Sequence, residues 1–287
     1  MKSLGRDAIR LYMKSPFRAK SRIRSVTDRW LAPKGNIERV RVGPCLIDLD
    51  HRHQATRNMA YGIYEKEEIA LLSRCLCPGD RAVDVGANVG YLSAHMARLV
   101  GPHGKVYSFE PGPTPFRSLQ AVKASNLQNN MEIFQMAVAD QEREATYYET
   151  DNILSKGYGR IDNRPSKRFQ HVKSCQIAVT SLATFFIDRP VDRLRLIKID
   201  VEGHEKQVID GLTGLLDRNV RPLLIMETTV SPSGKADCLD YENILGRYGY
   251  KMFLIGKSLS KATPDDLKKS FHGNVVWSTH ESGVDAG

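Results

Sequence analysis

The sequence predicts an α/β protein with a doubly wound, mostly parallel sheet, and two observations lead to this fold class. From about residue 62, short apolar runs alternate with segments of helical periodicity. These runs are continuously apolar, as in parallel strands that helices cover on both faces. The 287 residues, 41% of them hydrophobic, can bury one large core of this kind or two smaller ones. We expect one domain over residues 61–287, preceded by a lead-in segment over residues 1–60.

The lead-in segment begins with a basic arm. Residues 1–41 contain 12 basic and 3 acidic residues, which accounts for the whole net charge of +9, so the rest of the chain is neutral overall. Basic residues recur every four positions at Lys2, Arg6, Arg10 and Lys14. This spacing predicts a short amphipathic helix, which could lie on an anionic membrane surface, contact phosphates, act as a targeting segment or remain solvated.

Cysteine usage and hydropathy favour the cytoplasm. The five cysteines form no C-x-x-C pair and are odd in number, so neither a zinc site nor a full disulfide framework is expected. No apolar run approaches the roughly 20 residues of a membrane-spanning helix, and the arm lacks the apolar core of a secretory signal. We therefore expect a soluble, cytoplasmic protein that contacts membranes, if at all, peripherally through the basic arm.

The elements follow in a regular order. A helix with Ile69, Leu72 and Leu76 on one face ends at the turn Cys77-Pro78-Gly79-Asp80, and a strand at 82–85 leads through a glycine-rich bend into the next helix. Further strands are expected at 106–109, 133–138, 194–201, 223–226, 252–255 and 275–277, and further helices at 116–122, 208–216 and 241–248. The periodicity breaks at 151–171, which we interpret as an acceptor-binding loop or lid, or as a surface insertion.

The most informative motif is the bend after the first strand of the domain, Val-Asp-Val-Gly-Ala-Asn-Val-Gly-Tyr from Val83 to Tyr91. Ligands of doubly wound sheets lie at the carboxyl ends of the strands, where glycine allows close approach. A dinucleotide fingerprint would need glycine in place of Asn88 and Tyr91, and no P-loop Gly-Lys-Ser or Gly-Lys-Thr follows. Both phosphate cradles are therefore excluded.

Two carboxylates flank this bend. Asp84 ends one strand and Glu110 ends the next. A carboxylate at the second position can accept both hydroxyls of a ribose. The ligand is then a nucleoside that needs no phosphate cradle, and S-adenosylmethionine is the obvious candidate.

A second group of polar residues follows the strand that ends near Val201. Asp200 and Glu202 alternate onto the same side, and His204 begins the next helix. A hydroxyl acceptor of a methyl group must lose a proton, so these three residues are our catalytic candidates, with Asp200 and His204 as bases. Glu227, which ends a later strand, should face the same crevice. Three alternatives stay open: His204 could be a surface residue, Glu202 could be a helix cap, and Asp200, Glu202 and Glu227 could hold Mg²⁺. We assign no metal.

These motifs together resemble the FkbM family of S-adenosylmethionine-dependent methyltransferases. The resemblance rests on the blocks Asp84-Val85-Gly86-Ala87-Asn88-Val89-Gly90, Phe109-Glu110-Pro111, Ala137-Val138-Ala139-Asp140 and Lys198-Ile199-Asp200-Val201-Glu202-Gly203-His204-Glu205, with Tyr64-Glu65 and Pro78-Gly79-Asp80 upstream. It implies the Rossmann-like class I methyltransferase fold. It also implies a cofactor site in which Asp84, Gly86, Ala87, Asn88 and Gly90 hold the methionine part, Glu110 holds the ribose, and Ala137 lies beside the adenine.

The function that follows is O-methylation of a hydroxyl on a sugar, glycolipid or secondary metabolite, with S-adenosylmethionine as cofactor and a small-molecule or glycan acceptor as partner. One alternative is an RNA ribose methyltransferase, although the neutral body and the lack of an Asn/Asp-Pro-Pro-Tyr/Phe block make nucleic acid an unexpected partner. Another alternative is a non-catalytic protein that binds a nucleoside. In calorimetry with S-adenosylmethionine, an absence of binding would remove the enzyme interpretation.

Overall fold

The computed structural model describes residues 37–50, 54–60, 62, 64–150, 159–161, 172–231, 236–267 and 271–281. The predicted helix of the basic arm lies outside the described residues, as does most of the predicted loop at 151–171. Among the described residues, no helix is both long enough and apolar enough to cross a membrane.

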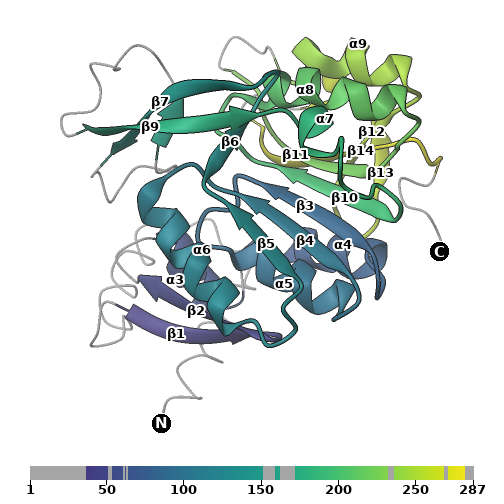
Figure 1. Ribbon diagram of the computed structural model, residues 1–287. Helices are drawn as coiled ribbons and strands as arrows, with labels where there is room; N and C mark the ends of the chain where they lie inside the picture. The colour runs from purple at the N-terminus through teal and green to yellow at the C-terminus, as the bar shows by residue number, and fades with distance from the viewer. Residues whose placement is uncertain are drawn as a thin grey trace, which may run out of the picture.

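The main sheet has eight strands in the order β13-β12-β14-β11-β10-β3-β4-β5 (Figure 1). Its parallel part consists of β11 (Leu223–Thr229), β10 (Leu194–Ile199), β3 (Arg81–Val85), β4 (Lys105–Phe109) and β5 (Met131–Phe134). Three antiparallel strands complete one edge: β14 (His272–Ser278), β12 (Lys251–Leu254) and β13 (Ser260–Ala262), which precedes the short 3-10 helix η1 (Pro264–Asp266). The prediction of a doubly wound, mostly parallel sheet is confirmed.

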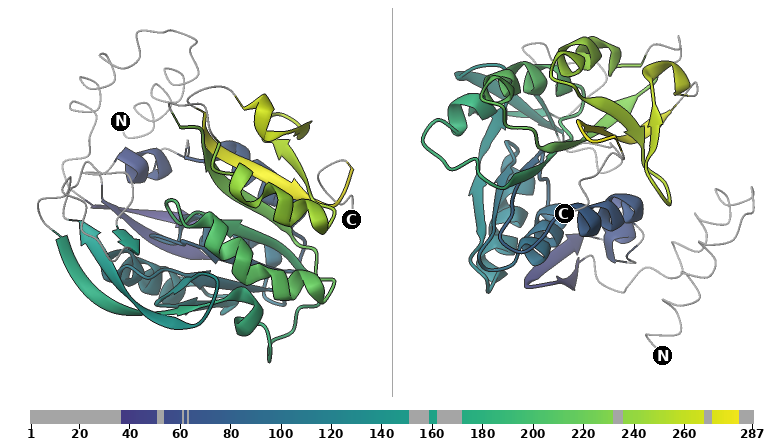
Figure 2. Two further views of the ribbon diagram at one scale, coloured as in Figure 1. Left: turned by 90° about the horizontal axis from the view of Figure 1, so that it is seen from above. Right: turned by 90° about the vertical axis from the view of Figure 1, so that its right-hand side faces the viewer.

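Helices cover both faces of this sheet, as Figures 1 and 2 show. One apolar cluster includes α4 (Lys66–Cys75), α5 (Tyr91–Val100) and α6 (Pro113–Ser125), and the other includes α7 (Leu182–Phe185), α8 (Glu205–Asp217) and α9 (Leu239–Arg247). The chain runs from β3 outward to β5 and then returns to the other side of β3 as β10. The order of the strands therefore reverses between β3 and β10, where such folds bind ligands.

Two smaller sheets flank the main one. The hairpin of β1 (Ile37–Val42) and β2 (Cys45–Asp50), followed by α3 (Gln54–Ala60), packs into the first apolar cluster through Cys45, Ile47 and Leu49. The other sheet contains β6 (Met136–Val138), β9 (Val172–Thr180), β7 (Arg143–Thr150) and β8 (Gly159–Ile161), in that order.

One predicted strand is divided in two. The sequence predicts a single strand over residues 133–138, but the chain bends at the exposed Gln135. The residues before the bend form β5 in the main sheet, and those after it form β6, which pairs with β9. The apolar residues on either side of Gln135 predict strand structure correctly but give no sign of the change of sheet, because both halves have the same apolar character.

Candidate active site

The bend between β3 and α5 is held in a conformation that favours glycine. Gly86, Asn88 and Gly90 all have positive φ angles, of 84°, 51° and 82°. A Cβ atom on Gly86 would lie 1.9 Å from the carbonyl oxygen of Asp200, and one on Gly90 would lie 2.8 Å from Leu119 on α6. The predicted glycines are therefore required by close packing of the bend against β10 and α6.

The backbone N–H groups of this bend are used within the protein. Gly86 and Ala87 donate to the carbonyl of Phe109 at 3.0 and 2.9 Å, and Gly90 donates to Ala87 at 2.8 Å. Asn88 donates to Oε2 of Glu110 at 2.8 Å. The bend thus offers no row of free N–H groups to a phosphate at these four positions, in agreement with the exclusion of phosphate cradles from the sequence.

Glu110 lies where the sequence places it, at the end of β4 and facing the bend. Its side chain is only 6% exposed, and its oxygens accept from the backbone N–H groups of Asn88 and Gly112, both at 2.8 Å. Burial raises the pKa of Glu110 to about 7, although the N–H groups of Gly112 and Asn88 oppose the shift. Each carboxylate oxygen accepts only one of these bonds and has capacity for another, so Glu110 can also accept from a ligand.

Asp84 and Ala137 are buried more deeply than Glu110. Ser93 on α5 donates to Asp84 at 2.5 Å, and Ser108 on β4 donates to Ser93 at 2.9 Å. Burial raises the pKa of Asp84 to about 6, against the opposing hydrogen bond from Ser93. Ala137 on β6 is buried in a third, smaller apolar cluster, with Tyr147 and Ile177. Asp84 therefore anchors α5 beneath the bend, while Ala137 forms part of the wall that continues into the small sheet.

The residues of this region fit an adenosyl group. The side-chain oxygen Oδ1 of Asn88 is buried and has no hydrogen-bond partner among the residues that the structure describes. The carboxylate of Glu110 and this amide oxygen are hydrogen-bond acceptors, which suit the hydroxyls and amino group of a nucleoside better than a phosphate.

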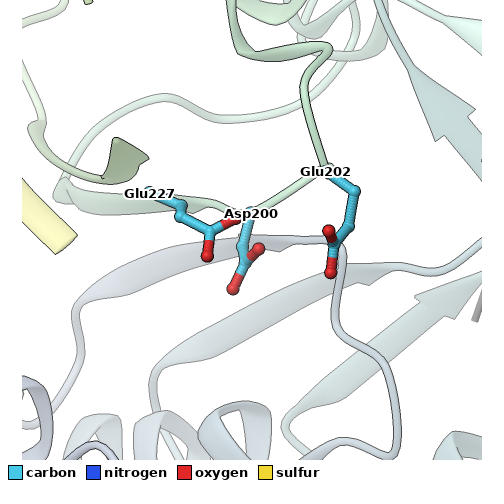
Figure 3. Close-up of side chains that lie close together, drawn as sticks. All are labelled: Asp200, Glu202 and Glu227. Carbon is cyan, nitrogen blue, oxygen red and sulfur yellow. The ribbon is translucent and has the colours of Figure 1, made fainter. Parts of the chain in front are cut away.

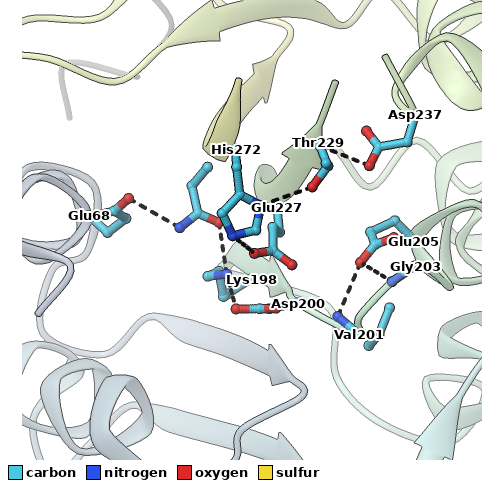
Figure 4. A network of polar contacts seen from close by, with 11 residues as sticks. Glu68, Lys198, Asp200, Val201, Gly203, Glu205, Glu227, Thr229, Asp237 and His272 are labelled. Atoms are coloured by element: carbon cyan, nitrogen blue, oxygen red, sulfur yellow. Dashed lines mark hydrogen bonds and ion pairs between the residues drawn. The ribbon is translucent and has the colours of Figure 1, made fainter. Parts of the chain in front are cut away.

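A polar face lies beside the bend, on β10, β11 and β14. The contributing residues lie two apart and therefore share a face: Lys198 on β10 and Asp200 directly after it, Glu227 and Thr229 on β11, and His272 and Asn274 on β14. Figure 4 shows the contacts of Lys198, Asp200, Glu227, Thr229 and His272. The buried Lys198 donates to Asp200 at 3.2 Å and to Asn274 at 3.0 Å, and Asn274 donates to Glu68 at 3.1 Å.

His272 completes this polar face. Its Nε2 lies 3.3 Å from Oε1 of Glu227, and its Nδ1 lies 3.0 Å from the hydroxyl of Thr229. The imidazole is therefore oriented by both neighbours, and it lies beside the same acidic residues that the sequence proposes for catalysis.

Asp200, Glu202 and Glu227 come together as the sequence predicts. One carboxylate oxygen from each lies within 4.8 Å of the others, and Figure 3 shows all three carboxylates turned toward the same region. Burial, together with Asp200 and Glu202, raises the pKa of Glu227 to about 8. This arrangement can accept a proton, and its spacing could also bridge a divalent cation.

The residues from Glu202 to Glu205 form the turn that leads from β10 into α8. Glu202 and Gly203 have positive φ angles, of 54° and 99°, and Glu202 is exposed. His204 is the half-buried residue before the first turn of α8. Glu205 is buried and accepts from the N–H groups of Val201 and Gly203 at 3.3 and 3.2 Å, so it stabilises the turn that carries Glu202.

With this geometry in place, comparison with known proteins gives the family. The family model described as "Methyltransferase FkbM domain" matches residues 84–252, more than half of the chain, from Asp84 through the acidic residues to β12. The chain belongs to the FkbM methyltransferase family. S-adenosylmethionine is the cofactor of this family, so the predicted family, fold and cofactor are confirmed.

Two curated proteins resemble this FkbM chain. The 31-O-demethyl-FK506 methyltransferase FkbM of Streptomyces tacrolimicus is 29% identical over 160 residues, which cover 48% of this chain and 61% of that protein. Methyltransferase 1 of Beauveria bassiana is 29% identical over 143 residues, or 45% of this chain and 57% of that protein. The match thus spans about three fifths of the length of each relative.

Solved structures resemble the chain more distantly. A methyltransferase FkbM from Methylobacillus flagellatus has a TM-score of 0.43 and 15% identity, covering 78% of this chain and 54% of that one. Fibrillarin from Aeropyrum pernix, which was solved with S-adenosyl-L-methionine bound, has a TM-score of 0.39 and 15% identity, covering 74% of both chains.

Several residues beside this FkbM site have roles that the sequence does not reveal. Lys198 is the first residue of the block that ends at Glu205, and His272 and Asn274 lie near the C-terminal end of the chain, far from any motif. The half-buried Glu65, before α4, faces Lys198; desolvation raises the pKa of Glu65 to about 7, although Lys198 opposes the shift. Polar residues alternate at 272 and 274, which suggests that they share one face of a strand. The sequence does not show that this strand, β14, pairs with β11, so it does not assign the two residues to the site.

Proposed function

We propose that this FkbM-family protein methylates a hydroxyl oxygen of a sugar, glycolipid or secondary metabolite. The observation that carries the proposal is the adjacency of two sites, a ribose-accepting carboxylate at Glu110 and an acidic cluster at Asp200, on either side of the bend at Gly86. The relative described as a 31-O-demethyl-FK506 methyltransferase supports an oxygen acceptor.

In this proposal, the residues of the chain have separate tasks. Glu110 binds the ribose, while the bend from Asp84 to Gly90 encloses the methionine part. When bound, S-adenosylmethionine supplies an electrophilic methyl group on a sulfonium. The acidic cluster then orients the acceptor hydroxyl in line with that methyl group and takes its proton, with Asp200 as the base and Glu202 and His204 beside it.

RNA is the weaker acceptor. The three clustered carboxylates would repel a phosphate backbone, although the basic arm could attract one. If RNA were bound through that arm, its affinity should fall steeply with added salt. A non-catalytic role would not explain why the carboxylates of Asp200, Glu202 and Glu227 are held close together.

The acceptor can be found directly. Extracts are incubated with the protein and S-adenosylmethionine that carries an isotopically labelled methyl group, and mass spectrometry then identifies the product that gains the label. We expect a small molecule with the label on oxygen. Label in RNA, or no labelled product in any extract when the protein binds the cofactor, would contradict the proposal.

The Glu110→Gln variant should bind S-adenosylmethionine at least about tenfold more weakly, because a charge-assisted hydrogen bond is worth roughly 1.5–3 kcal/mol. The affinity of the native protein should also fall as pH drops through about 7, where Glu110 becomes protonated and loses acceptor capacity. Calorimetry at pH 6 and pH 8 measures both effects. Glu132→Gln, at a half-exposed position that pairs with Lys105 on the surface, is the control. Equal dissociation constants for native protein and Glu110→Gln would remove Glu110 from the ribose site.

Asp200→Asn should keep the affinity for S-adenosylmethionine within about twofold and reduce methyl transfer by roughly a hundredfold, since it removes the base but leaves an oxygen for Lys198. The rate is measured with the acceptor identified above. Asp210→Asn, on the exposed surface of α8, serves as the control. Unchanged turnover in Asp200→Asn would exclude it as the base.

A further inference from the structure

The four-stranded sheet of β6, β9, β7 and β8, called the small sheet below, reaches over the loop that follows Glu110. Oε1 of Glu149 on β7 accepts from the backbone N–H of Thr114, at the start of α6, at 3.1 Å. Tyr147 lies two residues earlier on β7 and therefore shares the face of Glu149. Figure 1 shows β7 extending above α6. The inner face of β7 is thus held against the segment between Glu110 and Thr114.

The hydroxyl of Tyr147 lies close to the carboxylate of Glu110. A Cβ atom built on Gly112 would be 2.9 Å from Oη of Tyr147 and also 2.9 Å from Oε1 of Glu110. The two oxygens are therefore no farther apart than twice this distance. One bridging hydroxyl oxygen can span such a separation with a hydrogen bond to each side.

The phenol of Tyr147 is suited to donate. Its side chain is 4% exposed, and burial, together with Glu110 and Glu149, raises the pKa of Tyr147 above its ordinary value. The group therefore keeps its proton at neutral pH. Glu110 is a pure acceptor when ionised, so a ribose hydroxyl that donates to it still has an oxygen that can accept. Tyr147 supplies a donor at that place.

The ring of Tyr147 also occupies a defined place. It packs in the third apolar cluster with Ala137, the residue that the family resemblance places beside the adenine. Tyr147 thus lies between the expected adenine and ribose positions, on an element outside the main sheet.

We propose that Tyr147 is a cofactor-binding residue, whose hydroxyl donates a hydrogen bond to the ribose hydroxyl that Glu110 accepts. This proposal rests on the proposed function, because it takes the adenosyl group as the ligand. It gives the small sheet a role in cofactor binding, so the site is complete only when β7 is packed over Gly112.

The test compares two adjacent tyrosines by calorimetry with S-adenosylhomocysteine. Tyr147→Phe removes only the hydroxyl, and we expect affinity to fall roughly five- to tenfold. Tyr148→Phe makes the same change on the opposite face of β7 and should leave affinity unchanged. Circular dichroism and thermal melting confirm that both variants are folded. Equal affinities for the native protein and Tyr147→Phe would overturn the assignment of Tyr147.

A ligand-side change distinguishes direct contact from an indirect structural effect. Analogues of S-adenosylhomocysteine that lack the 2′ or the 3′ hydroxyl are measured with the native protein and with Tyr147→Phe. For one of the two analogues, the loss caused by Tyr147→Phe should shrink to less than twofold, because the bond is already absent. An equal loss with all three ligands would overturn the proposal. Failure of the native protein to bind any of them would instead refute the proposed function.

Discussion

Lys198→Met is expected to lower the free energy of unfolding by about 3 kcal/mol at pH 8. The side chain of Lys198 is 1% exposed. Its ammonium group contacts Asp200 and Asn274 and also faces Glu65 and Asp84. Burial alone lowers the pKa of Lys198, but these carboxylates outweigh it and raise the pKa above its ordinary value. Removing one partner of a buried ion pair costs about 3–5 kcal/mol, and the 28% exposure of Asp200 favours the lower end.

Urea denaturation at pH 5.5 and pH 8 measures this effect. Without Lys198, the pKa values of Asp84 and Glu65 should rise further, so protonation at pH 5.5 relieves part of the repulsion. The deficit of the variant should therefore be smaller at pH 5.5 than at pH 8. Lys206→Met is the control, because Lys206 forms an exposed pair with Asp210 that is worth at most about 1 kcal/mol. Equal losses for the two lysine variants would show that the buried network contributes little to stability.

Gly86→Ala is the second change with a large expected effect. A Cβ atom would lie 1.9 Å from the backbone carbonyl of Asp200, and the φ angle of 84° is unfavourable for alanine. Left-handed backbone costs about 1–2 kcal/mol and overpacking about 1–3 kcal/mol, so we expect a loss of about 3 kcal/mol. Relief of the clash must move the bend away from β10, so affinity for S-adenosylmethionine should also fall at least about tenfold.

Thermal melting and calorimetry measure the two consequences of Gly86→Ala. Gly246→Ala is the matched control: Gly246 lies in α9, and its Cβ would meet no atom within 4 Å. There, alanine should stabilise the protein by roughly 0.5–1 kcal/mol, since glycine weakens a helix. A Gly86→Ala variant with native melting temperature and native affinity would contradict the close contact between the bend and Asp200.

The sequence was informative about residues whose role depends on local context. Gly86 and Gly90 were identified because a strand, a tight bend and a helix follow one another within a few residues. Glu110 and Asp200 can be predicted because each follows a mainly apolar strand, and the carboxyl ends of parallel strands meet at one edge of the sheet. The close positions of Asp200, Glu202 and Glu227 confirm that geometric argument, while their catalytic roles stay predictions.

Other features depended on which strands become neighbours. Asn274 contacts Lys198 only because β14 enters the sheet antiparallel to β11, and Tyr147 reaches Gly112 only because the chain leaves the main sheet after β5. The fold class, the glycine bend and the acids at the strand ends can be predicted from the chain alone, since apolar runs and glycine positions act over a few residues. The partners of Lys198, Glu110 and Glu227 become visible only in the folded molecule, because strand order is selected by the packing of the whole core.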